Sequence, residues 1–117
     1  RNGKSNRLRG TRMNRRWWYV YFAQRSNDDA IKIGMSGDVS RRIQALRCEH
    51  GRDLRLLAYA DAGPQTERNL HCAFAEHRLD GEWFAPSKKL LDLIAYAAEH
   101  EKISWHILAV ANSEVAG

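Results

Sequence analysis

The sequence contains no long apolar run, no dense set of cysteines and no predicted signal peptide. Its longest unbroken apolar run, residues 17–23, is seven residues long, whereas about 20 are needed to span a bilayer. Two cysteines, Cys48 and Cys72, are too few for a disulfide scaffold, so we expect free thiols in a bacterial or phage-infected cytoplasm or another intracellular compartment. The first residues are polar and basic, so no signal peptide is predicted. Membrane and disulfide-scaffold classes are therefore excluded, and no membrane partner is expected.

Short motifs of the common enzyme classes are also missing. The sequence has no P-loop, dinucleotide-binding, HExxH or paired CxxC motif, and no serine or cysteine nucleophile in a recognisable setting. Its cysteines and histidines fit no zinc-binding spacing, and adjacent ones on a helix would point about 100° apart. We therefore interpret the following as buried thiols and ordinary histidines: Cys48, His50, His71, Cys72 and His77.

Acidic residues are absent from the first 16 positions, which hold 7 of the 19 Lys and Arg residues. Residues 17–117 hold the other 12 basic residues and all 14 acidic ones, so the positive net charge of +5 comes from residues 1–16 alone. This Asn-, Gly- and Ser-rich segment is expected to be a flexible basic arm, and residues 17–117 a single domain. The arm suits nucleic-acid phosphate, with DNA the first expectation and RNA the second; a solubilising tail is the alternative. The arginines expected to contact phosphate are Arg7, Arg9, Arg12, Arg15 and Arg16.

Apolar periodicity predicts an α/β fold with a small antiparallel sheet flanked by helices. A β-hairpin is expected around the Ser-Asn-Asp-Asp turn at 26–29, because aromatic and β-branched residues lie on both sides of it. Ser36-Gly37-Asp38 offers capping groups to the first helix. The predicted strands are residues 17–22, 30–34, 54–60 and a C-terminal 103–110, with an extended segment at 82–85; the predicted helices are 39–49, one from 64, and 88–99.

Each predicted helix has an apolar stripe expected to face the sheet. The stripes consist of Val39, Ile43 and Leu46 in the first helix, Leu70, Ala73, Phe74 and His77 in the second, and Leu90, Leu91, Ile94 and Ala98 in the third.

Residue types suited to phosphodiester hydrolysis are spread along these elements. The reaction needs a group that activates water, a cation for the phosphoryl oxygens and a carboxylate for a divalent metal. Tyr21, Lys32, Arg42 and Glu67 supply these types in order. Taken singly, Tyr21 also fits cross-strand packing, and Glu67 fits a first-turn carboxylate favoured by the helix dipole.

The order of these motifs resembles the GIY-YIG nuclease superfamily, particularly its phage-type branch, over roughly residues 18–94. Tyr19-Val20-Tyr21 is similar to the first half-motif and Lys32-Ile33-Gly34 to the second. Arg42 follows Gly34 by eight residues, as the family's catalytic arginine does, and Glu67 matches its metal-binding glutamate. The segment Gly81–Phe84 resembles the closing segment of the phage-type branch.

The resemblance implies a GIY-YIG-like nuclease fold and a role for each matched residue. Glu67 would bind Mg²⁺ or Mn²⁺, Tyr21 would activate the attacking water with help from Lys32 and Arg42, and Arg42 would neutralise charge on the phosphoryl oxygens. The chain departs from the family where Tyr19 replaces a glycine, Lys32 a tyrosine and Leu46 a His or Tyr, and where Glu82 takes the place of an Asn found in some relatives. Possible auxiliary residues are Tyr19, His71 and Glu82, with His50 as a second substitute at the position of Leu46.

Helix geometry separates two neighbouring arginines. On a 100° wheel Arg42 lies at the border of the apolar face, whereas Arg41 points away from it. Glu67 and His71 form an i,i+4 pair suited to facing one cleft. This geometry favours Arg42 as the residue that leans over the sheet.

Three functional hypotheses follow. The first is a metal-dependent DNA endonuclease with Mg²⁺ or Mn²⁺ as cofactor. The second is a non-catalytic nucleic-acid-binding module on the same fold, favoured by Leu46 and the altered half-motifs. The third is an interaction domain that binds no phosphate, which the near-neutral body of the chain allows.

Overall fold

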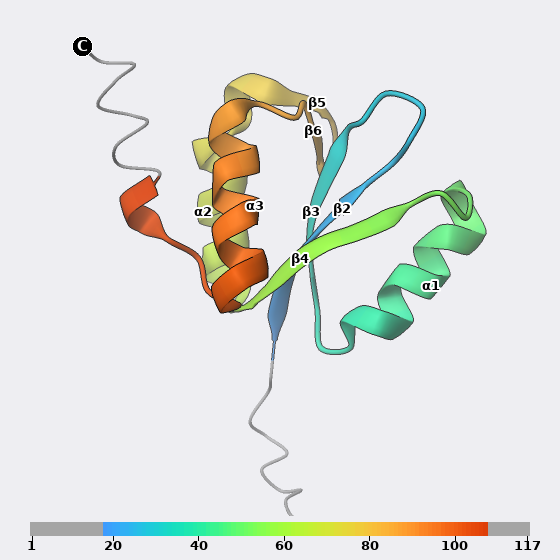
Figure 1. Ribbon diagram of the computed structural model, residues 1–117, viewed down its shortest axis with the longest axis horizontal. Coiled ribbons are helices and arrows are strands. Elements are labelled where there is room, and N and C mark those ends of the chain that lie inside the picture. Colours follow the sequence, from blue (N-terminus) through green and yellow to red (C-terminus); the bar gives the residue numbers. More distant parts are fainter. Residues whose placement is uncertain (1–17, 108–117) are drawn as a thin grey trace, which may run out of the picture.

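The computed structural model describes residues 18–107, so the basic arm predicted at 1–16, with its five phosphate-contacting arginines, lies outside the described residues (Figure 1). Its five strands form one antiparallel sheet in the order β4-β2-β3-β6-β5. The elements are β2 (Tyr19–Gln24), β3 (Ile31–Ser36), α1 (Val39–His50), β4 (Arg55–Asp61), α2 (Pro64–Ala73), the 3₁₀ turn η2 (Ala75–His77), β5 (Arg78–Asp80), β6 (Trp83–Phe84) and α3 (Lys88–His100).

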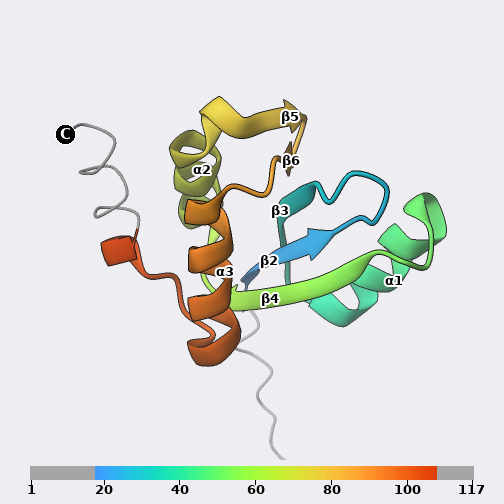
Figure 2. The same ribbon diagram turned by 45° about the horizontal axis from the view of Figure 1, so that its top comes forward.

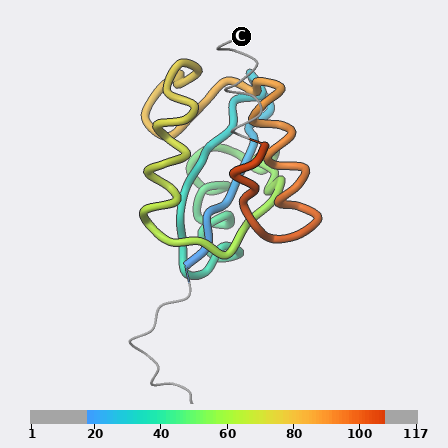
Figure 3. The backbone as a smooth tube through the Cα atoms, turned by 90° about the vertical axis from the view of Figure 1, so that its left-hand side faces the viewer, coloured from blue at the N-terminus to red at the C-terminus, as the bar shows by residue number. Residues whose placement is uncertain are grey.

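The sheet is covered on both faces. α1 packs on one face, and α2 and α3 lie side by side on the other (Figures 1, 2 and 3). The α/β fold with a small antiparallel sheet, predicted from the sequence, is confirmed. None of the helices in the described part of the chain is long and apolar enough to cross a membrane.

The alternation of side chains along β2 divides the core in two. Val20 and Phe22 pack with the α2 and α3 side chains. Tyr21 and Ala23 point the other way and pack with the buried face of α1. The functional residues of β2 and β3 therefore lie on the α1 face.

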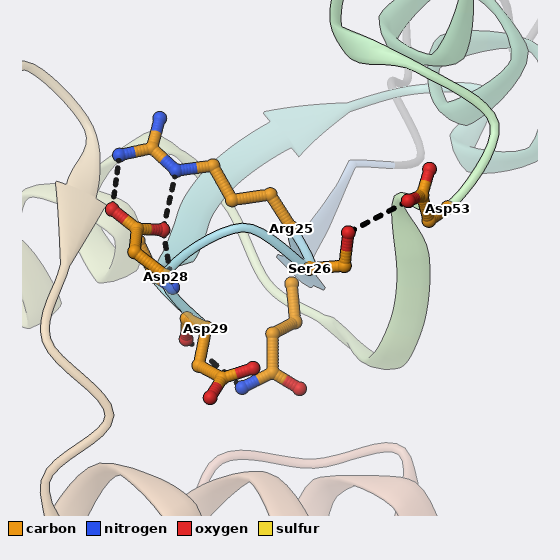
Figure 4. Close-up of polar contacts among 7 residues, drawn as sticks. Arg25, Ser26, Asp28, Asp29 and Asp53 are labelled. Atoms are coloured by element: carbon orange, nitrogen blue, oxygen red, sulfur yellow. Dashed lines mark hydrogen bonds and ion pairs between the residues drawn. The ribbon is translucent and has the colours of Figure 1, made fainter.

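Polar contacts fix the loop between β2 and β3 (Figure 4). The Arg25 guanidinium binds the Asp28 carboxylate at 2.8 Å, and that carboxylate also accepts from the Ala30 N–H at 3.1 Å. Ser26 Oγ donates to Asp53 Oδ2 at 2.7 Å, which ties the hairpin to the loop after α1. The turn predicted at 26–29 is thus built by its own polar side chains, which hold the register of β2 against β3.

Two predicted helix stripes were partly wrong. In α3 the buried residues are Leu90, Leu93, Ile94 and Ala97, whereas Leu91 and Ala98 are exposed. In the second stripe Ala73 and His77 are exposed, because α2 ends at Ala73 and the chain tightens into η2.

Other expectations failed at the ends of elements. Cys48 and Cys72 are exposed and not buried, because each lies on the solvent side of its helix.

The C-terminal strand predicted from 103 is wrong as far as the chain is described. Residues 105–107 are helical, and Ser104 Oγ accepts from the Ile107 N–H at 3.4 Å to begin that turn. The short strand β5 was not predicted, since its residues are all exposed and show no alternation.

Candidate active site

Tyr21 and Gly34 are cross-strand partners at the centre of the site. The Tyr21 ring lies over the Gly34 backbone so closely that a Cβ on Gly34 would come within 2.5 Å of the Tyr21 Cζ and Oη atoms. The Tyr21 side chain is 1% exposed. Glycine at position 34 therefore leaves the space in which the tyrosine ring lies.

Arg42 reaches this ring from α1. A hydrogen bond with Tyr21 raises the pKa of the Arg42 guanidinium, and the nearby charge of Glu82 acts in the same direction. The start of α1 is fixed by Asp38, whose Oδ1 accepts from the Arg41 N–H at 3.1 Å and whose carbonyl accepts from the Arg42 N–H at 3.0 Å. The position of Arg42 agrees with the helix wheel, which places it at the border of the buried face.

Lys32 is the buried cation of the site. Its side chain extends along the α1 face, where Nζ lies 2.7 Å from Glu82 Oε1 and 5.6 Å from the Trp83 ring. The backbone carbonyl of Glu82 also accepts from the Ile33 N–H at 3.0 Å. Because Lys32 is 8% exposed, the Glu82 carboxylate offsets much of the cost of burying its charge.

Glu67 faces the same region from α2. Burial, and secondly the charge of Glu82, raise the pKa of its carboxyl group, although His71, Lys32 and Arg68 act in the opposite direction. A carboxylate whose neighbours include another carboxylate favours a proton or a metal cation. One turn along the helix, His71 Nε2 donates to the Ile33 carbonyl at 2.9 Å, so Nε2 carries the proton.

The structure thus brings together side chains from β2, β3, α1, α2 and the turn before β6. We call this set the site cluster, and it consists of Tyr21, Lys32, Arg42, Glu67, His71 and Glu82. It contains both charge signs beside a phenol, which is the chemistry that a phosphodiester and a water molecule require.

Two residues considered as auxiliaries make ring contacts with residues outside the cluster. The Tyr19 ring packs edge to face with Tyr59, at 5.7 Å between centroids. His50 packs edge to face with Trp83 at 5.6 Å. Leu46, where the resemblance in sequence leads one to expect a His or Tyr, is 1% exposed and belongs to the core under α1. His71 and Glu82 are therefore the auxiliaries that join the cluster.

Sequence reasoning missed the part played by Trp83. Lys32 Nζ lies 5.6 Å from the centroid of the Trp83 ring, and the Arg25 guanidinium lies 4.4 Å from the same centroid. The signal for this was the pairing of Lys32 with Trp83 across β3 and β6, which depends on a two-residue strand too short to predict.

The metal expected from the sequence can be tested against these side chains. Among residues 18–107 no group of three or more His, Cys, Asp and Glu side chains is placed to hold a metal ion. Mg²⁺, however, keeps several waters and is often bound through one or two carboxylates together with substrate phosphate oxygens. Glu67, with Glu82 close enough to affect its pKa, fits that kind of donor set.

Comparison with known proteins gives one match. A family model described as the T5orf172 domain matches residues 17–99. No curated protein and no solved structure matched the chain.

Proposed function

The chain belongs to the T5orf172 domain family, an endonuclease-type domain, and on that premise we propose that it is a metal-dependent endonuclease that hydrolyses phosphodiester bonds in DNA. The observation that carries the proposal is the meeting of Tyr21, Arg42 and Glu67, from three different elements, in one cluster. The GIY-YIG-like half-motifs of β2 and β3 support it, since their tyrosine and glycine pack directly against each other.

Four residues of the cluster, Tyr21, Arg42, Lys32 and Glu82, act in the proposed reaction apart from the metal. Tyr21 activates the attacking water, with the Arg42 guanidinium hydrogen-bonded beside it. Arg42 also stabilises the negative charge that grows on the phosphoryl oxygens. Lys32 lies on the same face and adds a second cation, held in place by Glu82.

A divalent metal belongs to the proposal. Mg²⁺, or Mn²⁺ in its place, would be held by Glu67, and when bound it supplies a Lewis acid beside the scissile phosphate. The raised pKa of Glu67 supports this role, because a metal cation relieves the same burial and repulsion that favour its protonation.

DNA is the proposed polyanion, with RNA as the alternative. The first 16 residues supply seven positive charges, whereas the rest of the chain has a small acidic excess. Sequence-independent affinity would therefore come largely from the basic arm, and the site cluster would select the phosphate to be cut.

Cleavage of supercoiled plasmid tests this function. Wild type should nick the plasmid with Mg²⁺ or Mn²⁺ and not in excess EDTA. Glu67→Gln should lose cleavage but keep DNA affinity near wild type, while the matched control Glu76→Gln, at an exposed position on η2, should cleave normally. Full activity in EDTA or in Glu67→Gln would overturn the metal role.

A second candidate function has its own support. Lys32 and Glu82 are paired at 2.7 Å, and Leu46 is buried where similar nucleases carry a polar group. Both features suit a module that binds nucleic acid without cutting it. Salt-dependent DNA binding with no cleavage under any metal would establish this candidate in place of the first.

A further inference from the structure

A hollow of about 470 Å³ opens where α1 faces strands β2 and β4. Its volume lies in the ~300–1,000 Å³ range of small-molecule sites. Tyr19 from β2 and Tyr59 from β4 both line it, with their rings edge to face. Neither side chain is fully buried, so aromatic surface remains open to a ligand.

The hollow adjoins the site cluster through the register of the sheet. Tyr59 lies directly opposite Tyr21, and Tyr19 precedes Tyr21 by two residues in the same strand. These positions share one face of the sheet, where directly opposite Cβ atoms are about 4.5–5.5 Å apart. A phosphodiester held by Tyr21 and Arg42 therefore has a flanking nucleotide next to the hollow.

The charges around the hollow favour a neutral ring over a second phosphate. Arg47 brings a cation, but its Nε already donates to a backbone carbonyl at 2.9 Å. Asp38 and Glu101 line the same space and would repel an anion. Ser40 and Gln44 add a hydroxyl and an amide, which can donate to and accept from the edge of a base.

We propose that this hollow binds an unpaired nucleobase of the substrate, from a nucleotide flanking the scissile phosphate, against the rings of Tyr19 and Tyr59. A base inside a duplex is stacked and paired, so only a single strand or an extruded base can enter. The chain therefore prefers single-stranded or locally unpaired nucleic acid. This inference rests on the proposed function for the ligand class, but it concerns binding and does not require cleavage.

The test compares two single-stranded oligonucleotides of equal length, one base-bearing and one fully abasic, titrated in EDTA. Both carry the same phosphates, so the basic arm contributes equally to each. Wild type should bind the base-bearing strand about 5- to 150-fold more tightly, the range expected for base–aromatic stacking. Tyr19→Ala and Tyr59→Ala should each lose most of this preference without weakening binding to the abasic strand or to a paired duplex.

Two further variants serve as controls. Tyr96→Ala removes a tyrosine from α3, on the opposite face of the sheet, where its ring packs at a tilt against His100. This variant should keep the preference for the base-bearing strand. Tyr59→Phe retains an aromatic ring and should also keep the preference for the base-bearing strand. It tests the proposal even where Tyr59→Ala fails to fold.

Equal binding of the two strands by wild type would overturn the proposal. An equal loss of affinity for both strands in Tyr19→Ala and Tyr59→Ala would also overturn it, since the two rings would then only stabilise the fold. A preference for the base-bearing strand in a protein that never cleaves DNA would support base binding in the hollow and contradict the proposed nuclease function. Cleavage without this preference would support the nuclease function and contradict base binding in the hollow.

Discussion

Gly34 determines where the Tyr21 phenol lies, because its missing side chain leaves the space that the ring occupies. We expect Gly34→Ala to destabilise the protein by about 1–3 kcal/mol, as overpacking of a core commonly does, and to slow cleavage by displacing Tyr21. The measurement is denaturant unfolding of Gly34→Ala, alone and combined with Tyr21→Ala.

The combination isolates the contact. In the Tyr21→Ala background the cost of Gly34→Ala should fall well below its cost in wild type, since the clashing atoms are gone. Gly63→Ala is the control, because nothing lies within 4 Å of a Cβ at that position. The same cost in both backgrounds would mean that the two residues do not interact.

Glu67 connects function with stability. The pKa of its carboxyl group is raised in the folded protein, so the folded state binds its proton more tightly than the unfolded chain does. The contribution of Glu67 to the free energy of unfolding is therefore largest at low pH. It declines as the pH rises through that raised pKa. A charged Glu67 therefore destabilises the metal-free protein at neutral pH.

Glu67→Gln should accordingly raise the melting temperature in EDTA at pH 7–8. The group is partly exposed and screened by solvent, so we expect only about 1–3 °C, with no gain near pH 3, where the carboxyl group is protonated in both states. Glu76→Gln should show no such pH-dependent gain. A lower melting temperature for Glu67→Gln at neutral pH would contradict the origin of the shift.

Sequence reasoning at the scale of residues succeeded where spacing along one element decides the outcome. The helix wheel placed Arg42 at the border of the buried face because α1 is regular and its apolar stripe is complete. It could not place Tyr59 beside Tyr21, because that contact depends on the register between β2 and β4, which includes an irregularity between Phe22 and Ala23.

At the scale of elements, most strands and helices were predictable, whereas their ends were not. The hairpin has aromatic and β-branched residues on both sides of a polar turn, and α1 has a complete apolar stripe and a side-chain cap. α3 is apolar over more of its circumference, so two residues of its buried face were assigned wrongly, to Leu91 and Ala98 in place of Leu93 and Ala97. β6 is held by pairing to β3, and β5 by pairing to β6, so sequence pattern alone cannot define these two short strands.

The cap of α1 positions the arginine of the site. Asp38→Ala removes the side-chain acceptor for the Arg41 N–H and should cost about 1 kcal/mol of unfolding free energy. Because Arg42 is on the first turn of this helix, cleavage should also slow several-fold.

Ser87→Ala provides the comparison, since Ser87 caps α3 through the Leu90 N–H on the other face of the sheet. It should lose similar stability yet keep the wild-type cleavage rate, measured under conditions where both variants are folded. Equal rates in the two variants would show that the start of α1 does not position Arg42.

At the scale of the whole molecule, charge is divided between the arm and the domain. Deleting residues 1–16 removes seven positive charges. If every one met a phosphate, the slope of log K against log salt would flatten by up to ~6, at about 0.9 per contact, and about half of that is expected from a flexible arm. DNA-binding titrations across a salt series measure this slope. An unchanged slope would mean that the arm does not contact nucleic acid.

The central claim is that one cluster, assembled from separate elements, cleaves a phosphodiester bond with Arg42 beside the reacting atoms. The most direct measurement is the single-turnover cleavage rate at saturating DNA for wild type, Arg42→Ala and Arg41→Ala. Arg41 is the matched control because it is adjacent in α1, equally charged and exposed. We predict a loss of about 100-fold or more for Arg42→Ala, as for removal of a preorganised transition-state charge, and under about fivefold for Arg41→Ala, as for a screened surface charge. Equal losses at the two positions, with both variants melting close to wild type, would contradict the placement of the site.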